Sequence, residues 1–109
     1  MLLGANTMYQ LDFLPIAKQD ITEIANYISH ALYNPAAAEK LADEIIKSAE
    51  SLANSPYAHT VYKTVKSLKN EYRKLLVKNY IIFYWINEKK KQITIARVIY
   101  TRRDYKKLL

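Results

Sequence analysis

The residues best suited to chemistry gather near the end of the chain, where Arg102 and Arg103 stand between Tyr100 and Tyr105. The planar guanidinium group of arginine can bind two phosphate oxygens at once. A free phenol has a pKa of ~10, but neighbouring cations stabilise the phenolate and lower that pKa. These four residues could therefore bind a phosphate and transfer a proton beside it. The structural alternative is a pair of half-buried sheet tyrosines next to a solvated charge run.

The charge distribution divides the chain into an acidic and a basic part. Residues 1–59 hold three Lys and seven Asp or Glu, whereas residues 60–109 hold fourteen Lys or Arg and three acids. The net charge of +7 therefore comes from the second half, which suggests contact with a polyanion, either nucleic acid or an acidic protein. A solvated surface is the alternative. The candidate contact residues are Lys63, Lys66, Lys69, Lys74, Lys78, Arg97, Lys106 and Lys107.

Several classes of protein are disfavoured by what the sequence lacks. It has no cysteine for disulfides or thiolate metal sites, and its two histidines, His30 and His59, lie far apart. We therefore expect neither a metal nor another cofactor. No run approaches the ~20 apolar residues of a membrane span, and residues 1–7 do not read as a signal peptide. We expect a cytoplasmic protein with a loosely ordered leader at 1–7 and one domain at 8–109.

The first half predicts a strand and a helical hairpin. Apolar and polar residues alternate over 9–14, which is typical of a strand. Apolar spacings of three and four predict a helix from Pro15 to about Tyr33, with Asp20 and Glu23 facing solvent. Asn34 and Pro35 can begin a second helix, which ends near residues 54–56. The short link between these two helices predicts that they pack against each other.

The second half predicts most of a sheet. Residues 57–70 lack clean periodicity and read as a loop with a short strand near 60–65. Residues 71–78 and 80–86 predict a β-hairpin, and residues 92–100 a further strand, on which Arg97 and Tyr100 face opposite sides. Residues 102–109 form a basic tail. The predicted order is β-α-α-β-β-β, an α+β domain with the helical hairpin packed on a small, mostly antiparallel sheet.

Three segments, taken in order, resemble the RelE/ParE superfamily of toxins from type II toxin–antitoxin systems. Residues 13–28, with Pro15, Ala17, Asp20 and Tyr27, look like the family's first strand and helix. Residues 71–77 and 79–84 are similar to its central hairpin, and residues 95–105 to its last strand and C-terminal motif. The resemblance covers nearly the whole chain from Met8.

The resemblance implies a toxin held silent by a cognate antitoxin, whose toxin-binding segment is acidic or amphipathic. RelE-like members enter the ribosome and cut messenger RNA, whereas ParE-like members inhibit DNA gyrase. Nuclease members carry a phosphate-binding arginine where this chain has Arg73 and a histidine near Tyr100. Some nuclease members also have a working tyrosine near Tyr105. Neither His30 nor His59 falls at the catalytic position of the family.

From this resemblance, we expect a ribosome-dependent, metal-independent endoribonuclease that inhibits growth. Its candidate catalytic residues are Arg73, Tyr100, Arg102, Arg103 and Tyr105, and its partners are the antitoxin, the ribosome and messenger RNA. Two alternatives stay open. One is a ParE-like gyrase inhibitor that acts by binding, and the other is a degenerate toxin that acts only through antitoxin-dependent operator binding.

Overall fold

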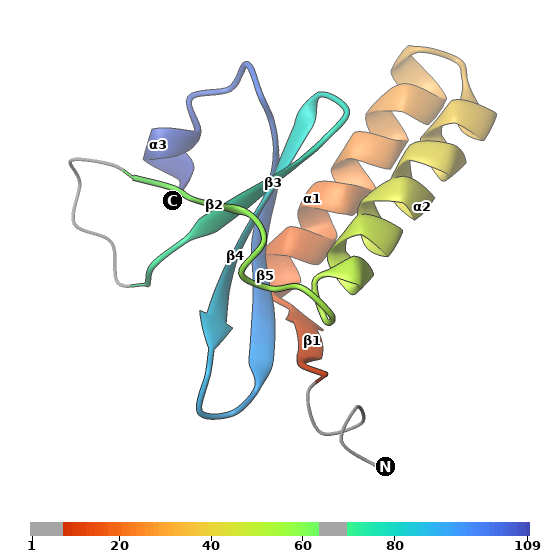
Figure 1. The fold of residues 1–109 in the computed structure, drawn as a ribbon. Helices are drawn as coiled ribbons and strands as arrows, with labels where there is room; N and C mark the ends of the chain where they lie inside the picture. The colour runs from red at the N-terminus through yellow and green to blue at the C-terminus, as the bar shows by residue number, and fades with distance from the viewer. Residues whose placement is uncertain (1–7, 64–69) are drawn as a thin grey trace.

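The computed structural model describes residues 8–63 and 70–109 as a sheet with helices on both sides. The strand order is β1-β5-β4-β3-β2, and all neighbours are antiparallel except β1 and β5. Figure 1 shows α1 and α2 side by side on one face, whereas the short α3 lies on the other side of the sheet. The predicted α+β class, with a helical hairpin on a mostly antiparallel sheet, is confirmed.

The N-terminal half forms β1 (Gln10–Phe13), α1 (Pro15–Asn26), the π-helical turn η2 (Tyr27–Ala31) and α2 (Pro35–Ser51). Pro15 and Pro35 each open a helix because their fixed φ suits the first turn. The Asn34 side chain caps α2 by accepting a hydrogen bond from the Ala37 N–H. The predicted single helix to about Tyr33 therefore ends in a π-turn, and Tyr33 follows with φ of 53°.

The other strands are β2 (Thr60–Val61), β3 (Arg73–Val77), β4 (Tyr80–Asn87) and β5 (Gln92–Tyr100). A two-residue turn joins β3 to β4, and Lys78 has φ of 55° there. β1 pairs with β5 only as far as Ile95, so the rest of that β5 edge meets no strand in the described chain. The pairing of β4 with β5 also shifts between Phe83 and Tyr84, which leaves Ala96 without a partner in the register.

The C-terminal segment folds back on the sheet, although the sequence predicted only a basic tail. Residues Tyr105–Leu108 form α3, and Tyr105, Leu108 and Leu109 pack against a buried cluster on the face opposite the helical hairpin. This cluster consists of Tyr62, Ile81, Phe83 and Ile99. A helix of four residues is too short for an apolar periodicity to be recognised.

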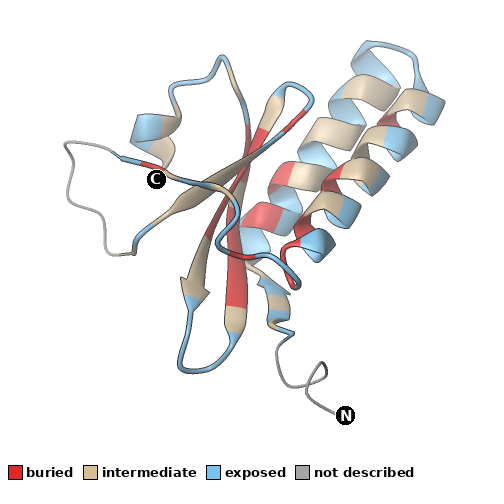
Figure 2. Cartoon of the chain, viewed as in Figure 1, coloured by how far each residue is buried: buried red, intermediate tan, exposed pale blue. Residues whose placement is uncertain are grey.

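The main core lies between the hairpin and the sheet. Figure 2 shows the buried residues on the inner sides of α1 and α2 and along the central strands. Ala17, Ile45, Leu52, Ile82 and Tyr84 are all fully buried there. Small residues such as Ala17 and Ala49 let the helices approach the sheet closely. Within the described residues, no helix is long and apolar enough to cross a membrane.

Candidate functional site

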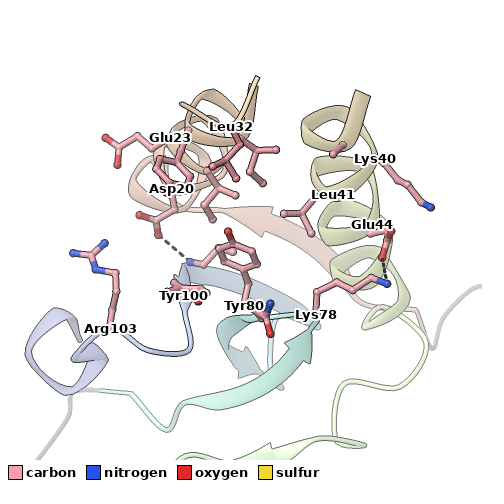
Figure 3. A pocket seen from close by; sticks show the side chains of 16 residues that line it. Asp20, Glu23, Leu32, Lys40, Leu41, Glu44, Lys78, Tyr80, Tyr100 and Arg103 are labelled. Carbon is pink, nitrogen blue, oxygen red and sulfur yellow. Dashed lines mark hydrogen bonds and ion pairs between the residues drawn. The ribbon is translucent and has the colours of Figure 1, made fainter. Parts of the chain in front are cut away.

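A groove of about 900 Å³ separates the end of the helical hairpin from the sheet. Its walls come from α1 and η2, the start of α2, the β3–β4 turn and the end of β5. Apolar side chains include Ile24, Tyr27, Leu32, Leu41 and Val98. Figure 3 shows Tyr80 and Tyr100 below Leu41 and Leu32, with charged side chains at both ends. The groove therefore combines an apolar centre with ionic ends.

Two of the predicted catalytic residues, Tyr100 and Arg103, line this groove together. Tyr100 is 37% exposed, and its ring lies 5.6 Å from that of Tyr80, its neighbour on β4. Burial raises the pKa of Tyr80, and the nearby phenols of Tyr100 and Tyr27 add to this shift. Arg102 is exposed and does not line the groove.

An ion pair lies at the other end of the groove. Lys78, in the β3–β4 turn, is 3.8 Å from Glu44 on α2 (Figure 3). Both side chains keep considerable exposure, so the pair contributes no more than about 1 kcal/mol to stability. The pair does, however, occupy Lys78, which the sequence analysis predicted to contact a polyanion.

Asp20 and Arg97 form the least exposed ion pair in the described chain, with side chains 8% and 13% exposed. Arg97 Nε and Nη2 donate to the two Asp20 carboxylate oxygens at 2.8 and 2.9 Å, and the Val98 N–H donates to Oδ2 at 2.9 Å. Hydrogen bonding to Asp20 raises the Arg97 pKa. The prediction that Asp20 faces solvent is wrong, because its carboxylate pairs with β5 beyond the end of β1.

Arg97 also holds the C-terminal helix. Its Nη1 donates to the Leu108 carbonyl at 3.2 Å, so one guanidinium joins α1, β5 and α3. All three guanidinium nitrogens of Arg97 thus donate hydrogen bonds within the protein. This position leaves little of Arg97 for contact with a nucleic acid or antitoxin. Arg97 is the cross-strand partner of Phe83, which belongs to the cluster under α3. Arg97 therefore lies on the face away from the groove that Tyr100 lines, as the strand pattern predicted.

Arg73 lies at the start of β3, at a distance from the groove. Its guanidinium donates to the His59 carbonyl at 2.7 Å and lies 5.0 Å above the Tyr57 ring. In the same region the Tyr84 hydroxyl donates to the Pro56 carbonyl at 2.8 Å. Burial raises the pKa of Tyr84 to about 12. Arg73 and Tyr84 therefore fasten the α2–β2 loop to the sheet.

Tyr105 lies on the opposite face of the sheet from Tyr100. Its ring is 5.4 Å from Phe83 and 5.9 Å from Tyr62. The Tyr62 hydroxyl is buried without a hydrogen-bond partner in the described chain. Tyr105 is thus an aromatic packing residue of the second cluster in this structure.

The remaining predicted contact lysines are spread over several surfaces. Lys63 is exposed after β2, and Lys74 Nζ lies 5.8 Å from the Tyr62 ring centroid. Lys106 and Lys107 are exposed on α3, where Lys107 lies 3.8 Å from Asp104. Lys66 and Lys69 lie outside the described residues. No group of three or more His, Cys, Asp or Glu side chains that could hold a metal occurs in 8–63 and 70–109.

A second polar cluster was not found by sequence reasoning. Tyr9 and Tyr57 both donate to Glu88 Oε1, at 2.6 and 2.7 Å, and Lys91 pairs with Glu88 Oε2. The hydrogen bonds from Lys91, Tyr9 and Tyr57 lower the pKa of Glu88 to about 2. Tyr9 and Tyr57 come from distant parts of the chain. The sequence alone shows only that Glu88 and Lys91 are three residues apart.

The sheet order and the helical hairpin match the fold of RelE/ParE-like toxins. The model of the ParE toxin of the type II toxin–antitoxin system parDE matches residues 11–105. The chain belongs to this ParE toxin family. No curated protein matches it.

The solved structures that share the fold include three toxin–antitoxin systems. The chromosomal ParDE toxin–antitoxin system from P. aeruginosa superposes with a TM-score of 0.72 at 17% identity, covering 88% of this chain and 99% of that one. The archaeal RelE–RelB complex from Pyrococcus horikoshii gives 0.59 at 15% identity, with 88% and 98% covered. The RelBE2 complex from Mycobacterium tuberculosis gives 0.54 at 18% identity, with 86% and 92% covered.

Proposed function

We propose that this type II toxin inhibits growth by binding a protein target, and that the target is DNA gyrase, as the ParE resemblance implies. The observation that carries the proposal is the separation of the residues that RNA cleavage would need. Cleavage without a metal requires a base, an acid and a cationic group around one phosphate. In the described chain these candidates occupy three different places.

The separation can be followed along the strands. Arg73 is paired with Tyr84, whereas Tyr100 is paired with Tyr80, four residues earlier on β4. At the usual rise of a strand this is about 13 Å. Tyr105 packs on the other face of the sheet. Tyr100 and Arg103 do share the groove, and this favours the nuclease as the second candidate.

The helical hairpin supports a binding activity because its tip is apolar and exposed. Leu32 is 55% and Tyr33 88% exposed, and Tyr33 has a positive φ that a tyrosine rarely adopts. Exposed aromatic and aliphatic side chains are suitable anchors for a protein interface. We therefore assign the contact with the target to the hairpin tip.

An antitoxin is the second partner that we propose, in keeping with the toxin–antitoxin complexes among the structures that share the fold. The groove has room for an amphipathic segment, and Tyr27 is 59% exposed at its wall. A complex recovered from native cell extract should lose the antitoxin when Leu41→Glu places a charge inside the groove. An unchanged complex from this folded variant would exclude the groove as the docking site.

The decisive experiment compares two activities of the same purified chain. We expect inhibition of plasmid supercoiling by gyrase and no ribosome-dependent cleavage of messenger RNA. The double variant Leu32→Ser/Tyr33→Ser should lose the inhibition, whereas Lys106→Ala/Lys107→Ala, on α3, should keep it. Ribosome-dependent cuts that disappear in Tyr100→Phe or Arg103→Ala would instead establish the nuclease.

A further inference from the structure

The turn between β4 and β5 carries a group of tyrosines and cations that lies outside both the groove and the hairpin tip. We call Tyr9, Tyr57, Glu88 and Lys89–Lys91, together with Arg73, the turn cluster. Figure 1 shows the β4–β5 turn at the end of the sheet away from both α3 and the hairpin tip. The cluster therefore forms a surface distinct from the groove.

The two tyrosine rings in this cluster are held in place. Both hydroxyls donate to the same Glu88 oxygen, which anchors the outer end of each side chain. A cation lies over each ring as well, with Arg73 Cζ 5.0 Å from the Tyr57 centroid and Lys91 Nζ 5.1 Å from that of Tyr9. Tyr57 nevertheless remains 52% exposed. An aromatic surface of fixed orientation is thus available to a partner.

The turn itself presents further positive charge. The Asn87 side chain accepts a hydrogen bond from the Lys90 N–H at 3.1 Å, and Lys91 adopts φ of 51°, so the turn is ordered. Lys89 and Lys90 are exposed, and neither takes part in an ion pair with the described residues. Within the turn cluster, four cations accompany one carboxylate, which Lys91 already neutralises.

We propose that the turn cluster binds single-stranded nucleic acid, with a base stacked against Tyr57 and its phosphates on Lys89 and Lys90. Exposed rings beside a row of cations are the combination that single strands require, because every base has a face that stacks and every linkage carries a charge. An acidic protein would be attracted by the lysines but would not need fixed rings. A duplex keeps its bases stacked within the helix and would not use them either.

The test measures fluorescence anisotropy of labelled oligo(dT) of about twelve nucleotides, with the full chain and a salt series. Lys89→Ala/Lys90→Ala should weaken binding about tenfold and lower the slope of log K against log salt by about 1.4, because each single-strand phosphate contact contributes ~0.7. The control Lys106→Ala/Lys107→Ala removes the same charge from α3 and should change affinity less than about twofold.

Stacking is tested separately by two substitutions of Tyr57. Tyr57→Leu should weaken binding about tenfold, whereas Tyr57→Phe, which keeps the ring, should retain most of the affinity. Equal losses from the two lysine pairs would overturn the proposal, because binding would then follow net charge alone. It is also overturned if oligo(dT) does not bind, or if a duplex of the same length binds as tightly. These outcomes do not depend on gyrase inhibition.

Discussion

Replacing Asp20 by alanine should destabilise the protein more than any other single change to a charged residue that we consider. The substitution leaves the Arg97 guanidinium, now 13% exposed, without its counter-charge, and it leaves the Val98 N–H without a carboxylate acceptor. Removal of one partner of a buried ion pair costs about 3–5 kcal/mol. A domain of this size is stable by only about 5–15 kcal/mol, so a large share of the stability would be lost.

Urea unfolding followed through Trp85, the single tryptophan, measures this loss. We expect the free energy of unfolding to fall by at least about 3 kcal/mol and Tm by more than about 12 °C. The matched control is Glu23→Ala on the same helix, because Glu23 is exposed and, among the described residues, its side chain is hydrogen-bonded only to Gln19. It should change stability by less than about 0.5 kcal/mol.

A double variant separates the charge effect from general damage to α1. In Asp20→Ala/Arg97→Met the uncompensated charge is gone, so the double variant should be more stable than Asp20→Ala alone. The reasoning is refuted if Asp20→Ala unfolds within about 1 kcal/mol of the wild type. It is also refuted if removing Arg97 in that background causes further loss.

Three further predictions concern the residues around the α2–β2 loop. Tyr84→Phe should cost about 1 kcal/mol in urea unfolding because the Pro56 carbonyl loses its donor. Absorbance titration should show Tyr84 ionising near pH 12. Because its folded pKa lies above the unfolded value of 10.0, stability should fall as pH rises between these values. If Tyr84 ionises near the ordinary value of 10.0, its burial does not act as described. The folded pKa of Glu88, about 2, lies below its ordinary 4.5, so its stabilising effect is complete above pH 4.5 and disappears as pH falls towards 2. Glu88→Gln should therefore flatten the dependence of Tm on pH in that interval, and an unchanged profile would contradict the assignment. Arg73→Ala should lower stability by about 1–2 kcal/mol through the lost bond to His59 yet preserve supercoiling inhibition, whereas complete loss of toxicity from a folded variant would favour the nuclease.

The sequence predicted the elements whose signal is local. Residues 92–100 were expected to form a strand, and β5 has these same bounds, because a run of β-branched residues between polar turns carries its own evidence. Pro15 and Asn34-Pro35 likewise marked both helix starts. The π-turn and α3 were not predicted, because each extends over no more than five residues and depends on packing.

The candidate site was harder to predict because its contacts connect distant residues. Asp20 has the helical spacing of an exposed acid, but its partner Arg97 lies 77 positions away, at a sheet edge exposed by the short β1. Similarly, nothing near Glu88 in the sequence indicates that Tyr9 will reach it. Patterns within one element report which face is apolar; they do not report which polar group another element brings to that face.

Such contacts between distant elements also reduce the number of cations that the charge asymmetry offers to a partner. The fourteen basic residues after position 59 suggested one polyanion surface, yet Lys78, Lys91, Arg97 and Lys107 are in ion pairs, and Arg73 is bonded to the His59 carbonyl. The Arg97 guanidinium on β5 bonds to Asp20 on α1 and to Leu108 on α3, and so joins these two helices. Among the described residues, the cations that can meet a partner are therefore those that take part in no ion pair. Among these, Lys89 and Lys90 stand beside fixed aromatic rings, so they offer a partner stacking as well as charge.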